Sequence, residues 1–151
     1  MSPSGVIEGG VHRWPVRVYY ENTDAGGIVY HANHLKFAER ARTEMLRCLG
    51  LDHRTLRARF GLTFAVRRCV ADFRAPARLD DLLEVETRAV RLGGASLDLT
   101  QDIRDGTRLL AHLELRLAML DAGLRAARMP EELRIALGPL RSRLLSARFK
   151  A

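Results

Sequence analysis

An α+β fold is predicted for this chain of 151 residues, with an antiparallel sheet packed against one long helix. Apolar residues recur at helical spacing along one stretch, and in several later stretches they alternate with polar residues, as in half-buried strands. Glycine-containing tight turns separate the alternating stretches, which is typical of antiparallel hairpins. One helix would cover only one face of the sheet, so we expect the other face to need a partner.

Composition and length indicate one globular domain. The chain is 47% hydrophobic and 28% charged, which excludes a disordered or collagen-like protein. It has no run of about 20 apolar residues and no N-terminal signal-like segment, so we expect a cytoplasmic protein. Cys48 and Cys69 have no CxxC partner, and we expect both to be small core residues.

The N-terminal half is predicted to hold one short strand and two helices. A stripe of apolar residues at helical spacing, from Ala38 to Leu49, predicts the long helix, which Gly50 ends. Asp52 is the candidate N-cap of the helix that follows. The predicted order is a strand at residues 16–20, a loop at 21–27, a long helix at about 30–49 and a short helix at 51–60.

The second half is predicted to contain four strands joined by tight turns. Gly93-Gly94 and Asp105-Gly106 are hairpin signals, the latter for a type I′ turn. Past Gly123 the chain becomes basic, and Pro130 and Pro139 limit it to one or two weak helices. The predicted strands cover residues 62–73, 82–92, 96–104 and 108–120.

Much of the formal net charge of +7 comes from the C-terminal segment. From residue 124 onward the chain has seven basic and two acidic residues. Phe149 is the one aromatic residue there, so base stacking is unsupported and we expect no nucleic-acid partner. The segment could dock on its own protein or on an anionic membrane surface. We favour the protein, because the two prolines interrupt a long interfacial helix.

The loop before the long helix is the strongest candidate for a chemical site. A helix N-terminus has unpaired backbone N–H groups and about half a positive charge, so it can stabilise an oxyanion. Asp24 lies ahead of His31, across Gly26 and Gly27. Its carboxylate could act on a carbonyl held by the first amides of the helix, as nucleophile or as general base. The alternative is an ordinary turn or capping aspartate.

The stretch around this loop reads YYENTDAGGIVYH from Tyr19 to His31 and continues with ANHLKF and ERARTEMLR. These residues closely resemble the signature of the hotdog-fold acyl-CoA thioesterases. The resemblance is to the YbgC-like branch of the 4-hydroxybenzoyl-CoA thioesterase family, whose genes often lie with those of the Tol–Pal envelope system. Asn22 and His34 stand where aspartate and tyrosine are common in that family.

The resemblance implies a hotdog fold, in which a five-stranded antiparallel sheet wraps around one long central helix. It implies hydrolysis of an acyl-CoA thioester to a free acid and coenzyme A, without cofactor or metal, by a homodimer or homotetramer with sites at the dimer interface. Asp24 would be the catalytic carboxylate, the His31 amide would polarise the carbonyl, and the Tyr20 and His31 side chains would line the site. The expected substrate-binding residues are Gly26, Gly27, Val29, Tyr30 and His34.

We expect a flexible N-terminus at residues 1–11, a hotdog domain at 12–125 and a basic extension at 126–151. His31 and His34 are spaced as metal ligands can be, but no third ligand is evident. The alternative function is that of a catalytically weak binding or scaffold protein of the Tol–Pal machinery. For the hydrolase and for the scaffold protein alike, we expect that the chain can associate peripherally with the inner membrane or with envelope proteins.

Overall fold

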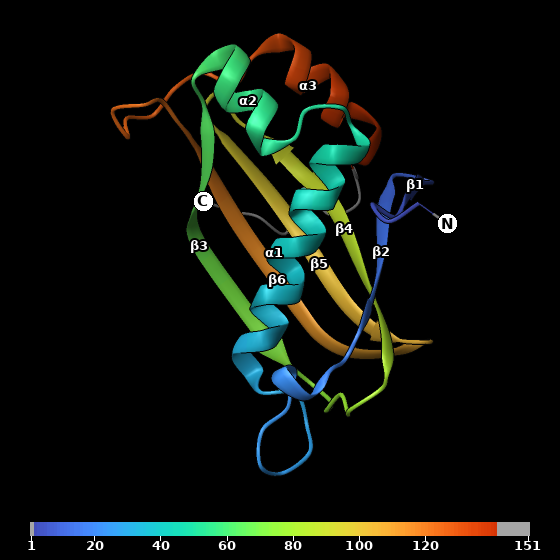
Figure 1. Cartoon of the computed structure of the whole chain (residues 1–151). Coiled ribbons are helices and arrows are strands. Elements are labelled where there is room, and N and C mark those ends of the chain that lie inside the picture. Colours follow the sequence, from blue (N-terminus) through green and yellow to red (C-terminus); the bar gives the residue numbers. More distant parts are fainter. Residues whose placement is uncertain (1, 142–151) are drawn as a thin grey trace.

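The computed structural model describes residues 2–141 and shows a six-stranded antiparallel sheet that curves around one long helix (Figure 1). The strand order is β1-β2-β4-β5-β6-β3. The strands are β1 (Val6–Glu8), β2 (Val11–Arg17), β3 (Thr63–Phe73), β4 (Leu82–Leu92), β5 (Ser96–Asp105) and β6 (Arg108–Leu120). The helices are α1 (His31–Cys48), α2 (His53–Phe60) and α3 (Glu131–Leu137), with 3-10 turns η1 (Tyr20–Asn22) and η2 (Gly138–Leu140).

The predicted α+β class and the antiparallel sheet around a long helix are confirmed, but the sheet has six strands rather than five. The additional strand, β1, lies inside the segment that was expected to be flexible and pairs with β2. The first predicted strand is also displaced, since β2 ends at Arg17. The alternation that predicts a strand was missed there because the polar His12 is buried at a position where an apolar residue is the usual signal.

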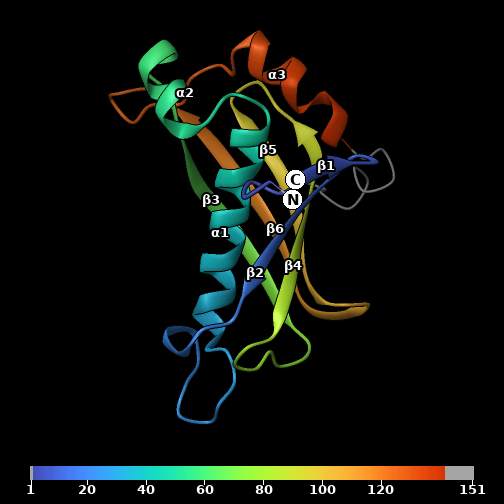
Figure 2. The same ribbon diagram turned by 45° about the vertical axis from the view of Figure 1, so that its right-hand side comes forward.

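Helix α1 buries one stripe of side chains against the concave face of the sheet (Figure 2). Ala38 and Ala41 are fully buried, and their small side chains allow a close approach to the strands. Gln101 of β5 reinforces this contact, since its side-chain amide donates to the Ala38 carbonyl (2.9 Å) and to the Thr87 hydroxyl (3.0 Å). Because buried polar groups are costly without partners, these bonds fix α1 along the sheet.

The face of the sheet turned away from α1 carries paired charges rather than an apolar surface. The buried Glu86 carboxylate lies 3.1 Å from Arg88 and 2.8 Å from Arg104. Arg116 donates two hydrogen bonds to the buried Asp98, at 2.7 and 2.9 Å. Because its charges are already paired within the chain, this face does not need an apolar covering layer. The expectation that the uncovered face of the sheet needs a partner therefore loses its basis.

Two local signals read from the sequence have different outcomes. Asp52 is the N-cap of α2, as predicted, and its carboxylate accepts a hydrogen bond from the Thr55 amide (2.8 Å). The β5–β6 hairpin turns at Gly106 and Thr107, and within residues 2–141 only Gly106 of this pair has a positive φ (+59°). A type I′ turn needs positive φ at both positions, so the turn fits type II′ and the prediction is wrong in this detail.

The C-terminal segment packs on the protein as far as residue 141. Helix α3 lies beside α2 at one end of the sheet (Figures 1 and 2). Leu133, Leu137 and Leu140 are fully buried in the main core, and the Arg134 guanidinium donates to the Gly93 carbonyl (2.7 Å). The remaining basic residues of the segment, beyond 141, lie outside the described residues.

Both cysteines are exposed, which corrects the expectation that they lie in the core. Cys48 ends α1, and its thiol donates to the Ser4 carbonyl (3.2 Å). Cys69 lies on β3, one of the two edge strands, where neither face is fully covered. Within residues 2–141, no helix is long and apolar enough to cross a membrane.

Candidate active site

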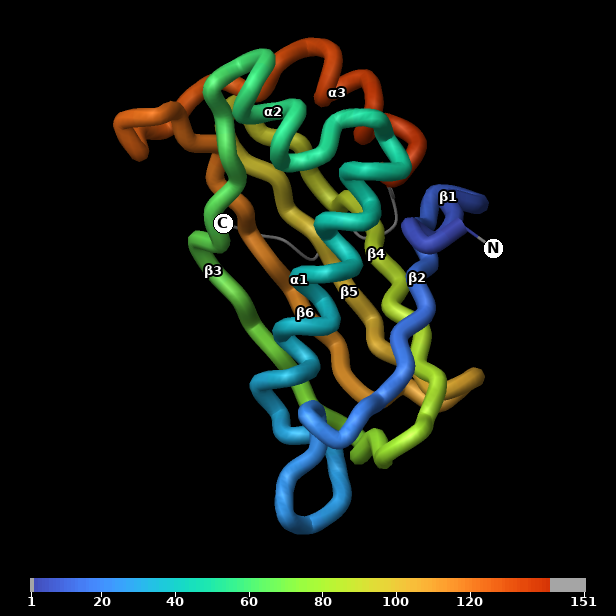
Figure 3. Tube along the Cα trace, viewed as in Figure 1, coloured from blue at the N-terminus to red at the C-terminus, as the bar shows by residue number. Residues whose placement is uncertain are grey.

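The loop between η1 and α1 forms a small hairpin that projects past the first turn of α1 (Figure 3). Thr23 and Val29 form an antiparallel bridge at its base. The Asp24 amide donates to the Ile28 carbonyl (2.9 Å), and the Gly27 amide donates to the Asp24 carbonyl (3.0 Å). The hairpin therefore holds Asp24 at its exposed tip by backbone bonds on both sides.

The Asp24 carboxylate is oriented by the glycines that follow it. Its Oδ1 accepts a hydrogen bond from the Gly26 amide at 2.8 Å. A Cβ at Gly26 would lie 3.2 Å from that oxygen, so a larger residue would crowd the carboxylate. Gly27 has a φ of +80°, in the region that favours glycine. The backbone therefore favours glycine at Gly27, and the close approach of the carboxylate favours a small residue at Gly26.

Two buried asparagines join the base of the hairpin to α1. The Asn22 carbonyl accepts from the Tyr30 amide (3.0 Å) and from the Asn33 side-chain amide (2.8 Å). The Asn22 side chain in turn accepts from the Tyr19 amide (2.8 Å). The sequence analysis noted Asn22 only as a departure from the family pattern and missed Asn33. Its helical position on the polar side of the stripe gave no sign that the amide is buried.

The N-terminus of α1 has no side-chain cap. Tyr30 is its N-cap residue and makes no side-chain capping bond, and the first turn contains no acidic residue. The preceding Val29 is buried, and its amide donates to the Ala77 carbonyl (2.8 Å), which anchors the start of the helix to the chain before β4. The positive end of the helix is thus not neutralised by its own side chains and lies directly after the Asp24 hairpin.

His31 and His34 contact an aromatic residue that the sequence analysis did not single out. Phe73, at the end of β3, lies with its ring centroid 6.0 Å from that of His31 and 5.6 Å from that of His34. The Tyr30 ring lies against His31 in a tilted arrangement, with 4.4 Å between the ring centroids. Phe73 is 44% exposed although it is apolar, and this exposure depends on tertiary structure that a sequence pattern does not show.

His34 differs from its neighbour because it is buried. Burial lowers the pKa of His34, and the adjacent His31 acts in the same direction. Within residues 2–141 its Nδ1 has no hydrogen-bond partner. His34 therefore packs as a neutral ring under Phe73 and Phe37 in the single chain.

The predicted site residues thus fall into two adjoining groups. Asp24, Gly26 and Gly27 occupy the hairpin tip, whereas Val29, Tyr30, His31 and His34 lie around the start of α1. Tyr20 lies on η1 with its side chain 82% exposed, and no hydrogen bond within residues 2–141 joins its hydroxyl to Asp24 or His31. The arrangement is open to solvent in one chain, and the Asp24 hairpin leads directly into the uncapped N-terminus of α1.

Comparisons with known proteins agree on one family. The sequence profile of the Thioesterase superfamily matches residues 26–112. The chain is 54% identical over 91 residues to acyl-CoA thioester hydrolase YbgC of Escherichia coli O6:H1, an alignment that covers 60% of this chain and 67% of that protein. It is 43% identical over 124 residues to acyl-CoA thioesterase YbgC of Haemophilus influenzae, covering 82% of this chain and 91% of that protein.

Solved structures show the same fold. The crystal structure of a probable thioesterase from Bartonella henselae superposes with a TM-score of 0.77 at 36% sequence identity, covering 80% of this chain and 99% of that one. The superfamily profile spans more than half of the chain, and the Haemophilus relative aligns over most of both sequences. This chain therefore belongs to the Thioesterase superfamily, with the hotdog fold of that superfamily and with the YbgC acyl-CoA thioesterases among its relatives.

Proposed function

We propose that this chain hydrolyses an acyl-CoA thioester to a free acid and coenzyme A. The observation that carries the proposal is the position of the Asp24 carboxylate, which the Gly26 amide orients on a hairpin joined to the uncapped N-terminus of α1. A carboxylate beside a helix end that stabilises an oxyanion suits acyl transfer from a thioester. The YbgC relatives are named for this activity.

In the proposed reaction, the thioester carbonyl oxygen accepts hydrogen bonds from the first backbone amides of α1, beginning with that of His31. Developing negative charge on this oxygen is stabilised by the positive end of the helix. Asp24 either attacks the carbonyl carbon, which forms an anhydride that water then hydrolyses, or removes a proton from a water that attacks the carbonyl carbon. In both routes the C–S bond breaks, the coenzyme A thiolate takes up a proton, and the acyl group leaves as the free acid. Tyr20 and the His31 ring line the site, while Gly27, Val29, Tyr30 and His34 border the bound acyl group.

A panel of acyl-CoA substrates of different chain length, together with an aromatic one, tests the proposal on the purified full chain. We expect steady-state release of coenzyme A from at least one of them. No turnover on any member of the panel would instead support the scaffold role in the envelope machinery. Single-turnover hydrolysis in ¹⁸O-labelled water separates the two roles of Asp24, because only direct attack transfers the label to its carboxylate.

We also propose that two copies of the chain pair through β3. This strand is the edge strand opposite β1, and one of its edges has no backbone partner strand within residues 2–141. Its apolar side chains are unusually exposed, at 50% for Val66, 45% for Val70 and 44% for Phe73. A long, exposed apolar edge strand is a surface that favours pairing with another chain. Because Phe73 also contacts His31, such a dimer would bring the second copy next to the proposed site.

Assembly into a homotetramer, a cytoplasmic location and contact with envelope proteins stay predictions. The paired charges on the outer face of the sheet make that face a polar surface for any further contact. Fractionation of cells that express the chain would test its location. Recovery in the soluble cytoplasmic fraction supports the prediction, and recovery with envelope membranes supports peripheral association.

A further inference from the structure

The connection between β3 and β4, residues 74–81, lies against the base of the hairpin that precedes α1 (Figures 1 and 2). Ile28 forms an antiparallel bridge with Arg78. The next residue, Val29, donates its amide hydrogen to the carbonyl of Ala77 (2.8 Å). Ala77 is fully buried, so this contact belongs to the core of the protein. The hairpin therefore depends on a backbone partner that is distant in the sequence.

A tight turn at the end of this connection is closed by the carboxylate of Asp81. Its Oδ2 accepts a hydrogen bond from the Arg78 amide (2.8 Å), and the Asp81 amide donates to the Arg78 carbonyl (3.1 Å). Asp80, within the turn, has a φ of +70°, in a region that residues other than glycine adopt uncommonly. Such a conformation persists where surrounding contacts hold it. The Asp81 carboxylate supplies one of these contacts, at the residue that bridges to Ile28.

The same turn is bonded to the end of β2, from which the chain enters the hairpin. The Val18 amide donates to the Asp81 carbonyl (2.9 Å), and the Asp80 amide donates to the Val18 carbonyl (3.0 Å). The Arg17 guanidinium donates to the Asp80 carbonyl (2.8 Å). Val18 is fully buried, so this contact also belongs to the core. The turn therefore holds the chain on both sides of the hairpin, at its entry after β2 and at its exit into α1.

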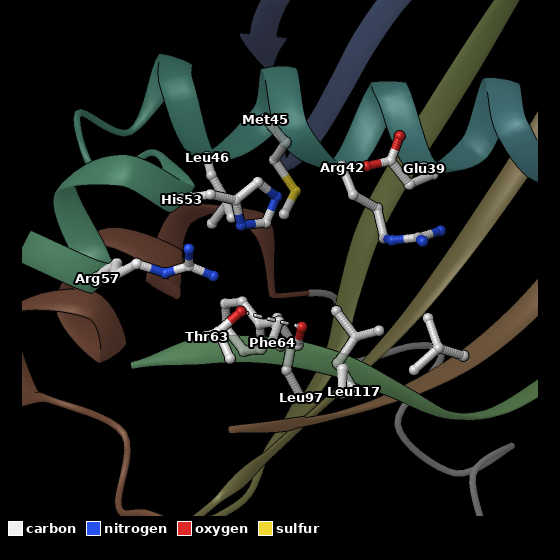
Figure 4. Close-up of a pocket in the computed structure, with 12 residues that line it drawn as sticks. Glu39, Arg42, Met45, Leu46, His53, Arg57, Thr63, Phe64, Leu97 and Leu117 are labelled. Atoms are coloured by element: carbon white, nitrogen blue, oxygen red, sulfur yellow. Dashed lines mark hydrogen bonds between the residues drawn. The ribbon is translucent and has the colours of Figure 1, made fainter. Parts of the chain in front are cut away.

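The core beyond the first two turns of α1 does not support the hairpin. There, a cavity of about 320 Å³ lies between α1, α2 and the sheet (Figure 4). Glu39, the first residue of α1 to reach it, comes eight residues after His31, or about 12 Å along the helix. Among its lining residues within 2–141, none belongs to the hairpin or to the 74–81 connection. The position of the hairpin therefore depends on the contacts at its own base.

We propose that Asp81 is a positioning residue for the hydrolysis proposed above, because its carboxylate holds the turn that holds the Asp24 hairpin. Asp81 fixes the Arg78 amide, and Arg78 bridges Ile28. The Ile28 carbonyl in turn accepts the Asp24 amide (2.9 Å). A displacement of about 1 Å can lower the rate of a positioned group about a hundredfold, so a loosened turn slows the reaction. The inference rests on the proposed role of Asp24.

Steady-state kinetics of Asp81→Ala and Asp81→Asn, on an acyl-CoA that the full chain hydrolyses, test this role. Alanine removes the acceptor of the Arg78 amide, whereas asparagine keeps a side-chain oxygen that can accept it. In Asp81→Ala we expect kcat to fall at least about tenfold and KM to change less than about twofold, since the turn affects the position of the reacting group. Asp81→Asn should restore kcat to within about threefold of the wild type. Equal losses of kcat in the two variants would overturn the proposal.

Asp121→Ala is the matched control. The Asp121 carboxylate also closes a turn, since it accepts the amides of Gly123 (2.9 Å) and Arg125 (3.0 Å). This turn likewise contains a residue with positive φ, Leu124 at +62°, but it follows β6. No hydrogen bond within residues 2–141 joins it to the Asp24 hairpin. We expect wild-type kcat in Asp121→Ala, and a loss equal to that of Asp81→Ala would contradict a specific role for Asp81.

Hydrogen exchange measures the link between turn and hairpin without any substrate. The amides of Asp24 and Val29 are both bonded at the hairpin base. We expect the peptide covering residues 23–30 to exchange at least about fivefold faster in Asp81→Ala than in the wild type, and at the wild-type rate in Asp121→Ala. Unchanged exchange in Asp81→Ala would overturn the proposal, and so would faster exchange with unchanged kcat. Faster exchange in a chain that hydrolyses no acyl-CoA would instead refute the proposed function, and the positioning role with it.

A second variant serves if Asp81→Ala does not fold. Arg17→Met removes the other side-chain hydrogen bond to this turn, at the Asp80 carbonyl, and Arg17 is exposed. We expect the peptide covering residues 23–30 to exchange faster in this variant and kcat to fall at least about threefold. Wild-type exchange and wild-type kcat in folded Arg17→Met would contradict the proposal.

Discussion

At the residue scale, the side-chain amide of Asn33 links the hairpin that carries Asp24 to the first turn of α1. We expect Asn33→Ala to lower the free energy of unfolding by about 1–2 kcal/mol, because it removes a buried hydrogen bond to the Asn22 carbonyl. The turnover number should fall as well, since the hairpin that carries Asp24 loses a contact. Urea unfolding and steady-state kinetics measure the two effects. Lys36→Ala, at an exposed position on the same helix, is the control, and equal losses in both variants would contradict this role for Asn33.

His34 is expected to make the stability of the protein depend on pH. Its pKa is lowered in the folded state by burial, so the unfolded state binds the proton more readily. The stabilising contribution is present above about pH 6.5, the ordinary histidine value, and is lost as the pH falls below it. Buried His12 acts in the same direction. We therefore expect the decrease in Tm between pH 7.5 and 5.5 to be smaller in His34→Phe than in the wild type. An unchanged decrease would contradict the prediction.

Some site residues could be read from the sequence, and others could not. Asp24 and the glycines form a compact pattern before a helix, so a local reading is sufficient to propose them. Phe73 and Asn33 belong to the same region only through tertiary contacts, across more than 40 residues in the case of His31 and Phe73. A single sequence contains no signal for such pairs.

At the scale of elements, α3 behaves as part of the domain core. Leu137→Ala is expected to lower the free energy of unfolding by about 2–5 kcal/mol, because the leucine is fully buried. Ile135 lies on the same helix but is 69% exposed, so Ile135→Ala should change stability by no more than about 0.5 kcal/mol. Urea unfolding of the two variants provides the comparison. Similar, small effects would mean that α3 is only loosely attached.

The strands with a clean alternation were predicted most accurately. Strands β4 and β6 have the predicted bounds, Leu82–Leu92 and Arg108–Leu120. One face of each strand is apolar and packs on α1 or on the core beside it. The N-terminal strands were missed or displaced because their inward residues include His12. The Nε2 of His12 forms a hydrogen bond with the Ser4 carbonyl (2.7 Å). Burial of a polar residue with a specific partner breaks the pattern on which the prediction rests.

At the scale of the whole molecule, the exposed edge of β3 is expected to determine assembly. Val70→Glu places a charge in the proposed pairing edge, so we expect it to convert the assembled protein to a monomer. Light scattering coupled to gel filtration measures this change. Leu124→Glu is the control, because Leu124 is 73% exposed and lies beyond β6. A wild-type monomer at micromolar concentration, or an assembled Val70→Glu variant, would contradict pairing through β3.

The hydrolysis of an acyl-CoA by the Asp24→Asn variant tests the proposed function most directly. Asparagine retains a side-chain oxygen that can accept the hydrogen bond from the Gly26 amide. The loop should therefore keep its shape while the negative charge is lost. Asp24 is exposed, and the Tm should therefore stay close to that of the wild type. We expect kcat to fall by at least about a hundredfold, as for the loss of a positioned catalytic base. A well-folded variant with near-normal turnover would show that Asp24 is not the catalytic carboxylate.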